Sequence, residues 1–261
     1  MTGLCGFVIY LILTFHDGEF HVYFLDIGQG DSVLFVTPDG SEVLIDGGPG
    51  NKVIEELGEV LPFYDKTIEM LVLTHPDKDH MEGLVEVLKR YKVAKVMITG
   101  VLKQDALYEE FLREIDDIDV IIVDENSDFI YSEVSFDVLY PFEQIAGEEF
   151  ENVNDTSIAL MVEYEGKRVL LTGDAEEAEE NELIAADLDL RADIFKAGHH
   201  GSKSSSSFEF LEKVRPKITV ISAGKNNQYG HPHAETLENL EKIGVINMYR
   251  TDLEGRIEFE F

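Results

Sequence analysis

The chain has 261 residues, and its 44% hydrophobic content is enough to bury the core of one large domain or two small ones. Lys and Arg total 21 against 53 Asp and Glu, a formal net charge of −32 that repels nucleic acids and anionic membranes unless cations offset it locally. The single cysteine, Cys5, excludes an internal disulfide and a Cys-rich zinc module. We interpret the acidic runs as solvated outer faces, with adaptation to a salty medium as the alternative.

The stretch LCGFVIYLILTF (4–15) is uncharged and mostly apolar. It is shorter than the roughly 20 residues of a spanning helix, and it lacks the basic start and cleavage site of a signal peptide. Two interpretations stay open: a short or truncated membrane anchor, or a first strand or helix packed on the domain. An anchor would make the protein membrane-associated or extracytoplasmic; otherwise we expect it in the cytoplasm. We assign residues 1–18 to this apolar segment and 19–261 to one domain.

Apolar residues alternate on both sides of the turn signal PDG, which predicts a hairpin over 31–48 after a strand over 19–28. A helix over 52–64, a buried strand over 68–74, a helix over 81–91 and a strand over 94–100 follow. The second half repeats the theme with a hairpin over 156–174 turning at Glu165-Gly166, an acidic helix, and strands over 192–198 and 217–224, each leading into a helix. Two such halves predict an α+β fold with two mixed sheets face to face and helices outside, an αββα sandwich.

Polar clusters sit directly after the predicted strands, and five of the eight histidines fall in these loops. Ligand residues at strand ends can converge on one rim of a sandwich. Taken singly, each cluster has an ordinary explanation, such as a turn or an exposed pair. The residues concerned are Asp46, His75, His80, Asp174, His199, His200 and His231.

The stretch HPDKDH (75–80) places four candidate ligands in six positions. His75 and Asp77, two apart in an extended segment, project the same way and suit one metal ion, whereas Asp79 and His80 suit a second. Imidazole and carboxylate groups bind Zn²⁺ or Mn²⁺, and Asp174 can bridge the two ions. The alternative is a helix N-terminus that is rich in Asp through capping. We therefore predict two divalent metal ions, Zn or Mn.

HPDKDH resembles the H-x-H-x-D-H motif of the metallo-β-lactamase superfamily. The Asp at its third position resembles one branch, the domain at the C-terminal end of ComEC-type bacterial DNA-uptake channels. Other stretches agree in order: FLDIGQGDS (24–32), LIDGG (44–48), NDTSIAL (154–160), LLTGD (170–174), KAGHHGSKSS (196–205) and GKNNQYGHP (224–232). The resemblance runs from about residue 20 to 261. It implies the metallo-β-lactamase fold for a hydrolase domain that stands without the channel's membrane part.

The resemblance also implies a ligand set. Aligning the His-x-Ser of nucleases in this superfamily on His200-Gly201-Ser202 favours His200 as the ligand, with His199 beside it. No histidine lies between 80 and 199, so we expect Asp155 to replace the superfamily's usual extra histidine. Asp46 is expected to orient the ligand loop. The implied metal ligands are His75, Asp77, Asp79, His80, Asp155, Asp174, His199 and His200.

The implied reaction is hydrolysis of a phosphodiester by hydroxide activated between two ions, with Asp79, Asp174 and His231 as the catalytic residues. His231 is expected to protonate or bind the leaving group; alternatively it caps the helix that follows Pro232. The expected substrate-binding residues are Ser202, Lys203, Lys225, Asn226 and Asn227. The serines alternatively cap a helix, because Ser206 and Glu209 have capping-box spacing.

The charge and the lack of a basic stripe with interleaved aromatic residues argue against a processive DNA nuclease. We expect a phosphodiester substrate that is a short nucleic acid or a small molecule. One alternative is a hydrolase of small phosphodiesters or other esters, as among the phosphocholine esterases. The other is a non-catalytic binding module stabilised by metal. The sequence indicates no protein partner.

Overall fold

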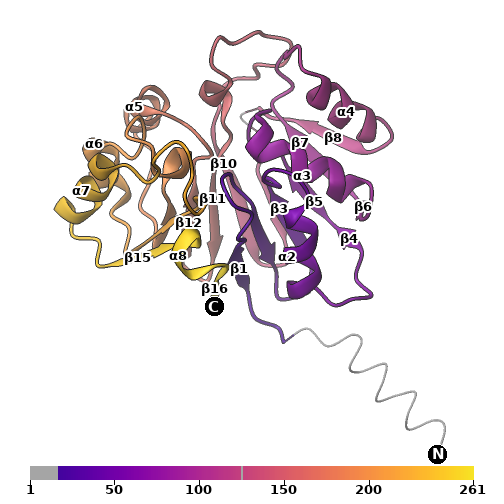
Figure 1. Ribbon diagram of the computed structural model, residues 1–261, viewed down its shortest axis with the longest axis horizontal. Coiled ribbons are helices and arrows are strands. Elements are labelled where there is room, and N and C mark those ends of the chain that lie inside the picture. The colour runs from indigo at the N-terminus through magenta and orange to yellow at the C-terminus, as the bar shows by residue number, and fades with distance from the viewer. Residues whose placement is uncertain (1–16, 125) are drawn as a thin grey trace, which may run out of the picture.

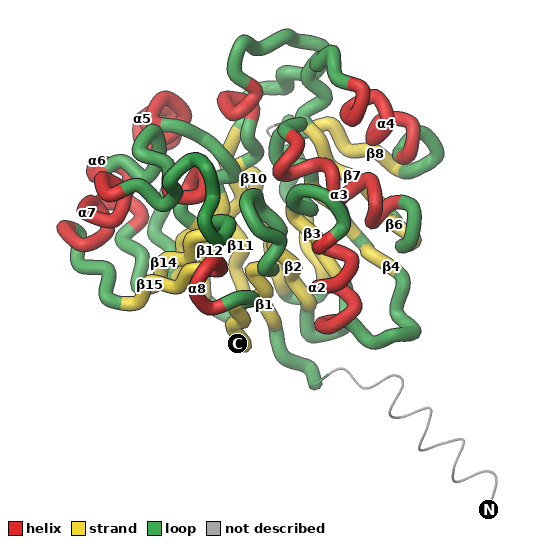
Figure 2. Tube along the Cα trace, in the orientation of Figure 1, coloured by secondary structure: helices red, strands yellow, loops and turns green. Residues whose placement is uncertain are grey.

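The computed structural model describes residues 17–124 and 126–261. Two seven-stranded sheets pack face to face, and helices cover the outer face of each (Figures 1 and 2). The prediction of an αββα sandwich is therefore confirmed. The apolar stretch 4–15 lies outside the described residues. Within the described ranges, no helix is both long and apolar enough to span a bilayer.

The first sheet has the order β16-β1-β2-β3-β5-β7-β8, so the last strand of the chain pairs with the first. Its strands are β1 (His21–Phe24), β2 (Val33–Val36), β3 (Glu42–Ile45), β5 (Met70–Val72), β7 (Lys95–Ile98), β8 (Asp119–Ile122) and β16 (Ile257–Glu260). The helices on its outer face are α2 (Lys52–Val60), α3 (Lys78–Leu88) and α4 (Ala106–Glu114), near the short pair β4 (Thr67–Ile68) and β6 (Lys92–Val93).

The second sheet has the order β15-β14-β13-β12-β11-β10-β9. Its strands are β9 (Phe129–Tyr131), β10 (Val134–Tyr140), β11 (Ala159–Tyr164), β12 (Lys167–Leu171), β13 (Ile194–Lys196), β14 (Ile218–Ile221) and β15 (Asn247–Arg250). The covering helices are α5 (Glu177–Ala185), α6 (Phe208–Val214) and α7 (Ala234–Lys242). The remaining short helices are η1 (Val153–Thr156), η2 (Gly198–Gly201) and α8 (Thr251–Glu254).

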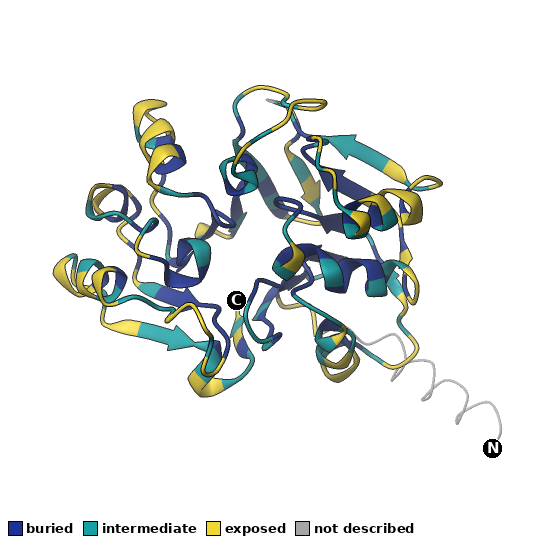
Figure 3. Ribbon diagram, turned by 45° about the horizontal axis from the view of Figure 1, so that its top comes forward, coloured by how far each residue is buried: buried dark blue, intermediate teal, exposed yellow. Residues whose placement is uncertain are grey.

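The alternation of side chains along each strand sorts the core into layers. On β2, Val33 and Phe35 point into the cluster between the sheets, whereas Leu34 points to the helices of the first sheet. Phe35 meets Phe136 of the other sheet edge-on, with 5.5 Å between ring centroids. Figure 3 shows this buried layer between the sheets and the exposed outer sides of the helices.

Strand direction places the functional loops. β3, β5, β7 and β8 run parallel, as do β12, β13, β14 and β15. The carboxyl ends of parallel strands meet at one edge of a sheet, so the loops after β3, β5, β12, β13 and β14 gather there. The loop after β1 joins them, because β1 and β3 are both antiparallel to β2.

Candidate metal centre

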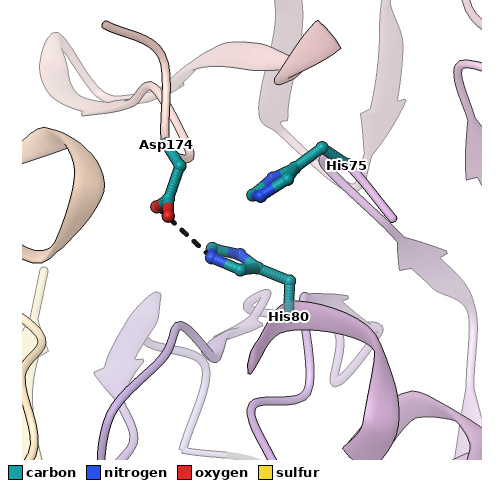
Figure 4. A group of neighbouring side chains, drawn as sticks. All are labelled: His75, His80 and Asp174. Carbon is teal, nitrogen blue, oxygen red and sulfur yellow. Dashed lines mark ion pairs between the residues drawn. The ribbon is translucent and has the colours of Figure 1, made fainter. Parts of the chain in front are cut away.

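Three buried side chains converge at this edge from both halves of the molecule (Figure 4). His75 follows β5, His80 lies in the first turn of α3 and Asp174 follows β12. The Nε2 atom of His80 lies 3.3 Å from Oδ1 of Asp174, and the two imidazole rings lie 4.2 Å apart between centroids. One ligand atom of each residue lies within 4.8 Å of the others, a spacing that a single ion can occupy.

A second group shares residues with the first. Nε2 of His200 lies 3.4 Å from Oδ2 of Asp79 and 3.3 Å from Oδ2 of Asp174. Asp174 thus turns one carboxylate oxygen toward His80 and the other toward His200. This geometry suits a carboxylate shared by two ions.

The buried atoms of the centre fit divalent metal ions. Nε2 of His75, His80 and His200 and Oδ1 of Asp174 have no hydrogen-bond partner among the described residues. A buried polar atom without a partner costs about 1–3 kcal/mol, and cations bound at the two ligand groups would satisfy all four. Nitrogen and carboxylate oxygen donors together are the set that Zn²⁺ and Mn²⁺ accept.

The electrostatics favour positive charge at the same place. Burial alone would lower the pKa of His80, but the carboxylates of Asp174 and Asp46 raise it well above its ordinary value. Burial would raise the pKa of Asp174, but His200 and His80 hold it well below the ordinary value. Burial and the neighbouring His80 lower the pKa of His75. The carboxylates therefore stabilise a local cation.

Asp46 makes hydrogen bonds to both ends of the loop that carries the expected ligands. Its carboxylate accepts hydrogen bonds from the backbone N–H and the hydroxyl of Thr74, at 2.8 and 2.7 Å, and from Nδ1 of His80 at 2.7 Å. Asp46 has a φ of 58°, in the left-handed region that Asp tolerates better than most residues. This buried contact orients Nε2 of His80 toward Asp174.

The loop after β1 contains residues that the sequence reasoning did not single out. Asp31 accepts a hydrogen bond from Nδ1 of His200 at 3.1 Å and forms a buried ion pair with Lys196. A side chain at Gly30, where φ is 141°, would collide with the carbonyl of Asp79. Only glycine therefore allows this loop to approach α3 so closely. The motif FLDIGQGDS is the sequence feature that could have pointed to these residues, although a motif alone does not show which side chains they contact.

Asp77 lies at the N-cap of α3, but its carboxylate makes no capping hydrogen bond. Oδ1 instead lies 2.6 Å from Nζ of Lys103, which also donates to the carbonyl of Pro76. Asp77 lines the metal cleft but belongs to none of the close ligand groups. Asp77 therefore does not cap α3 through its side chain. The pairing of His75 with Asp77 around one ion stays a prediction.

The structure does not bring Asp155 to the centre. Its carboxylate, on η1, accepts from Nδ2 of Asn152 at 2.8 Å, and it belongs to none of the close ligand groups. Ser157 of the same motif is the residue that reaches the site. Its buried hydroxyl lies 3.3 Å from Nδ1 of His75 and accepts the backbone N–H of Asp174 at 3.1 Å. The expected substitution of Asp155 for a missing histidine thus has no support in this geometry.

The HHGS loop separates its two histidines. Both have positive φ angles, 46° for His199 and 55° for His200, a conformation that costs about 1–3 kcal/mol per residue. His200 is buried in the ligand group, whereas Nδ1 of His199 lies 3.1 Å from Glu176 and its Nε2 lies 3.7 Å from Asp174. This arrangement agrees with the preference for His200 and places His199 at the mouth of the cleft.

His231 lines the metal cleft and does not cap α7, because the N-cap is His233. Its Nδ1 atom lies 3.3 Å from Nε2 of Gln29, a group that only donates, so Nδ1 accepts and the proton of neutral His231 sits on Nε2. Burial and the neighbouring His200 lower the pKa of His231 to about 4. The cleft therefore contains a neutral imidazole N–H donor at pH 7.

The expected substrate-binding residues do not line the metal cleft together. The hydroxyl of Ser202 bonds to that of Ser204, and Lys203 lines a separate surface hollow beside Glu177. Asn227 holds its own loop through the backbone of His231. Lys225 and Asn226 are exposed on that loop. The alternative capping box of Ser206 and Glu209 is not formed, because the N-cap of α6 is Ser207, whose hydroxyl accepts from the backbone N–H of Phe210.

The sequence profile of the metallo-beta-lactamase superfamily matches residues 25–225. ComE operon protein 3 of Bacillus subtilis is 33% identical over 99% of this chain and 35% of its own length. Recombination protein 2 of Haemophilus influenzae is 31% identical over 99% of this chain and 31% of its own length. The chain thus spans about a third of these relatives, and the similarity extends further toward the N-terminus than residue 20.

Among solved structures, CmlA, a diiron beta-hydroxylase from Streptomyces venezuelae, has the same fold. It superposes with a TM-score of 0.60 at 17% identity, over 93% of this chain and 54% of its own. The fold, the ordered motifs and the profile match agree, and the chain belongs to the metallo-beta-lactamase superfamily, with relatives of the ComEC type.

Proposed function

We propose that this domain is a metal-dependent phosphodiesterase that acts on nucleic acid. The observation that carries the proposal is the placement of Asp174 between two ligand groups, whose unpartnered buried atoms face one another beside a cleft of about 150 Å³. Divalent ions held there would activate water and neutralise the non-bridging oxygens of a phosphodiester. The resemblance to Recombination protein 2 supports nucleic acid as the substrate class.

The chain's own residues have definable tasks in this reaction. His75, His80, Asp79, His200 and Asp174 would hold the ions, with Asp77 as the further ligand beside His75 that the sequence predicts. Asp46 and Asp31 keep the Nε2 atoms of His80 and His200 turned inward by accepting from Nδ1 of each ring. The Nε2–H of His231 faces the same cleft and can donate a hydrogen bond to the leaving oxygen.

The small metal cleft favours a second candidate, a hydrolase of small phosphodiesters. A cleft of about 150 Å³ holds little more than the reacting phosphate group, and the charge of −32 opposes long polyanions. The two candidates differ in whether binding extends beyond the cleft.

The test compares a single-stranded oligonucleotide with glycerophosphocholine as substrates of protein loaded with Mn²⁺ or Zn²⁺. We expect shortening of the oligonucleotide. Asp174→Asn should lower turnover by more than about 100-fold, because changes outside the ligand set alone cost 10–100-fold. The matched control, Asp117→Asn at an exposed position, should retain wild-type turnover. Cleavage of glycerophosphocholine alone would favour the second candidate. Cleavage of neither would leave a metal-stabilised binding module.

A further inference from the structure

A second hollow opens directly beside the metal cleft and shares three lining residues with it. The hollow has a volume of about 420 Å³, compared with about 150 Å³ for the cleft. Gln29, Asp79 and Tyr229 line both. The other lining residues are Pro49, Lys78, Asn227 and Gln228. We call this hollow the Tyr229 groove.

Tyr229 presents an aromatic face at the junction of the cleft and the groove. It is 54% exposed, and its ring stacks on His231 with 5.7 Å between centroids and 27° between planes. A large exposed aromatic residue beside a polar reaction site indicates a binding surface more strongly than an isolated apolar residue elsewhere on the surface. The His231 ring supports one face of the Tyr229 ring, and the groove lies beside Tyr229.

The loop that carries Tyr229 is held in place before any ligand arrives. Nδ2 of Asn227 donates to the carbonyls of Gly224 and His231, at 3.0 and 2.7 Å. The backbone N–H of Gly224 donates to Oε1 of Gln29 at 3.0 Å, which joins this loop to the loop after β1. A side chain at Gly224 would lie 2.7 Å from the backbone nitrogen of Gln29, so this close contact requires glycine. Tyr229 is therefore a preorganised platform.

We propose that the Tyr229 groove binds an unpaired nucleobase next to the scissile phosphodiester, with the base stacked on Tyr229. This inference rests on the proposed function and names its substrate class: single-stranded nucleic acid. Stacking requires a base outside a duplex, and it does not depend on net charge, which suits a strongly acidic protein. The exposed Lys78 on the groove wall, whose Nζ lies 3.5 Å from Oε1 of Glu82 in a surface ion pair, is the lining cation nearest the proposed phosphate position.

The test uses two single-stranded oligonucleotides of equal length, one of thymidines and one with abasic sites in place of the bases. For each variant, kcat/KM on the thymidine strand is divided by that on the abasic strand. Tyr229→Ala should lower this ratio roughly tenfold, within the range known for base stacking on an aromatic residue, whereas Tyr229→Phe should preserve it. The control is Tyr64→Ala, which removes another exposed tyrosine, 41% exposed and outside both the cleft and the groove.

An unchanged ratio in Tyr229→Ala, or an equal loss in Tyr229→Phe, would overturn the stacking proposal. Binding of the same strands by fluorescence anisotropy, to metal-loaded protein, separates this failure from failure of the proposed function. If wild-type protein cleaves neither strand, the nuclease function fails. Tighter binding of the thymidine strand that Tyr229→Ala abolishes would still support the groove, and equal binding of both strands would refute it.

Discussion

Nδ1 of His80 donates to Oδ2 of Asp46 across 2.7 Å, and both side chains are buried. The relationship is repeated on the other side of the centre, where Nδ1 of His200 donates to Asp31. In each pair the carboxylate fixes which ring nitrogen carries the proton and turns Nε2 toward Asp174. Such partners raise the basicity of an imidazole ligand and set its orientation.

The first prediction follows from this pairing. Asp46→Asn should lower the affinity for metal about 10–100-fold, because the amide presents only one acceptor to three donors. Asn tolerates the positive φ of this position, so the backbone should survive. Metal titration followed by calorimetry measures the change, with the melting temperature of the metal-free protein as the control for folding. Wild-type affinity in Asp46→Asn would show that this contact does not tune the centre.

The second prediction concerns which of the two ions each aspartate binds. Asp77→Ala should reduce the metal content from two ions per chain to about one, since Asp79, His80 and His200 remain. Asp174→Asn should weaken both ions. Elemental analysis after desalting measures the content of each variant.

Two further variants serve as controls for Asp77. Asp77→His should retain two ions, because it restores the commoner motif of the superfamily. Lys103→Met should also retain two, since it only releases Asp77 from its ion pair. A full complement in Asp77→Ala would mean that Asp77 serves Lys103 rather than a metal.

The sequence predicted the sandwich and the strand-end ligands because both depend on short patterns. The residues that follow parallel strands lie at one edge of the sheet, so His75, Asp174 and His200 could be grouped from the sequence alone. Side-chain direction is not encoded in this way. Asp155 has suitable chemistry but turns to Asn152, and Ser157, two residues later, reaches the site instead.

Other elements escaped prediction because they depend on distant pairings or on weak periodicity. β16 is far from β1 in the chain, and only the fold brings them together. The segment that forms α4, β8, β9 and β10 carries many acidic residues, which obscure its apolar periodicity. Asp31 and Gln29 sit in a loop whose contacts come from two distant loops, those after β13 and β14.

The third prediction concerns Glu42 on β3, which is buried and has an Oε2 atom without a hydrogen-bond partner among the described residues. Burial, with the nearby Asp65 and Glu69, raises the pKa of Glu42 to about 9. The folded state therefore keeps a proton that the unfolded chain releases above its ordinary pKa of 4.5. It follows that this group destabilises the fold progressively as pH rises from 4.5 toward 9.

Glu42→Gln cannot ionise, so its free energy of unfolding should exceed that of the wild type by an amount that grows between pH 5 and 8. We expect a gain of several kcal/mol at pH 8, because each pH unit between the two pKa values contributes up to about 1.4 kcal/mol. Urea unfolding at each pH measures it. Glu133→Gln, at an exposed position, should show a constant difference. A Glu42→Gln difference that stays constant over this range would contradict the burial argument.

The last prediction concerns the charge of −32, which acts on the whole fold. Like charges on the surface repel one another most at low ionic strength, where the Debye length is about 30 Å at 0.01 M, compared with about 8 Å at 0.15 M. Added salt should therefore raise the melting temperature, by about 2–4 °C for each kcal/mol of repulsion that it screens. Binding of an oligonucleotide should also strengthen between very low and moderate salt, whereas a basic nuclease loses affinity over the same range.

A variant with fewer charges tests the cause. Glu148, Glu149 and Glu151 are exposed and have no ion-pair partner among the described residues. Replacing all three by Gln should raise the melting temperature at 0.01 M salt and flatten its rise with salt, because less repulsion remains to be screened. Calorimetric scans of both proteins across a KCl series measure the slopes. A wild-type melting temperature that falls as KCl is added would show that ion pairs such as Lys89–Glu110, which salt weakens, outweigh the repulsion of the acidic surface.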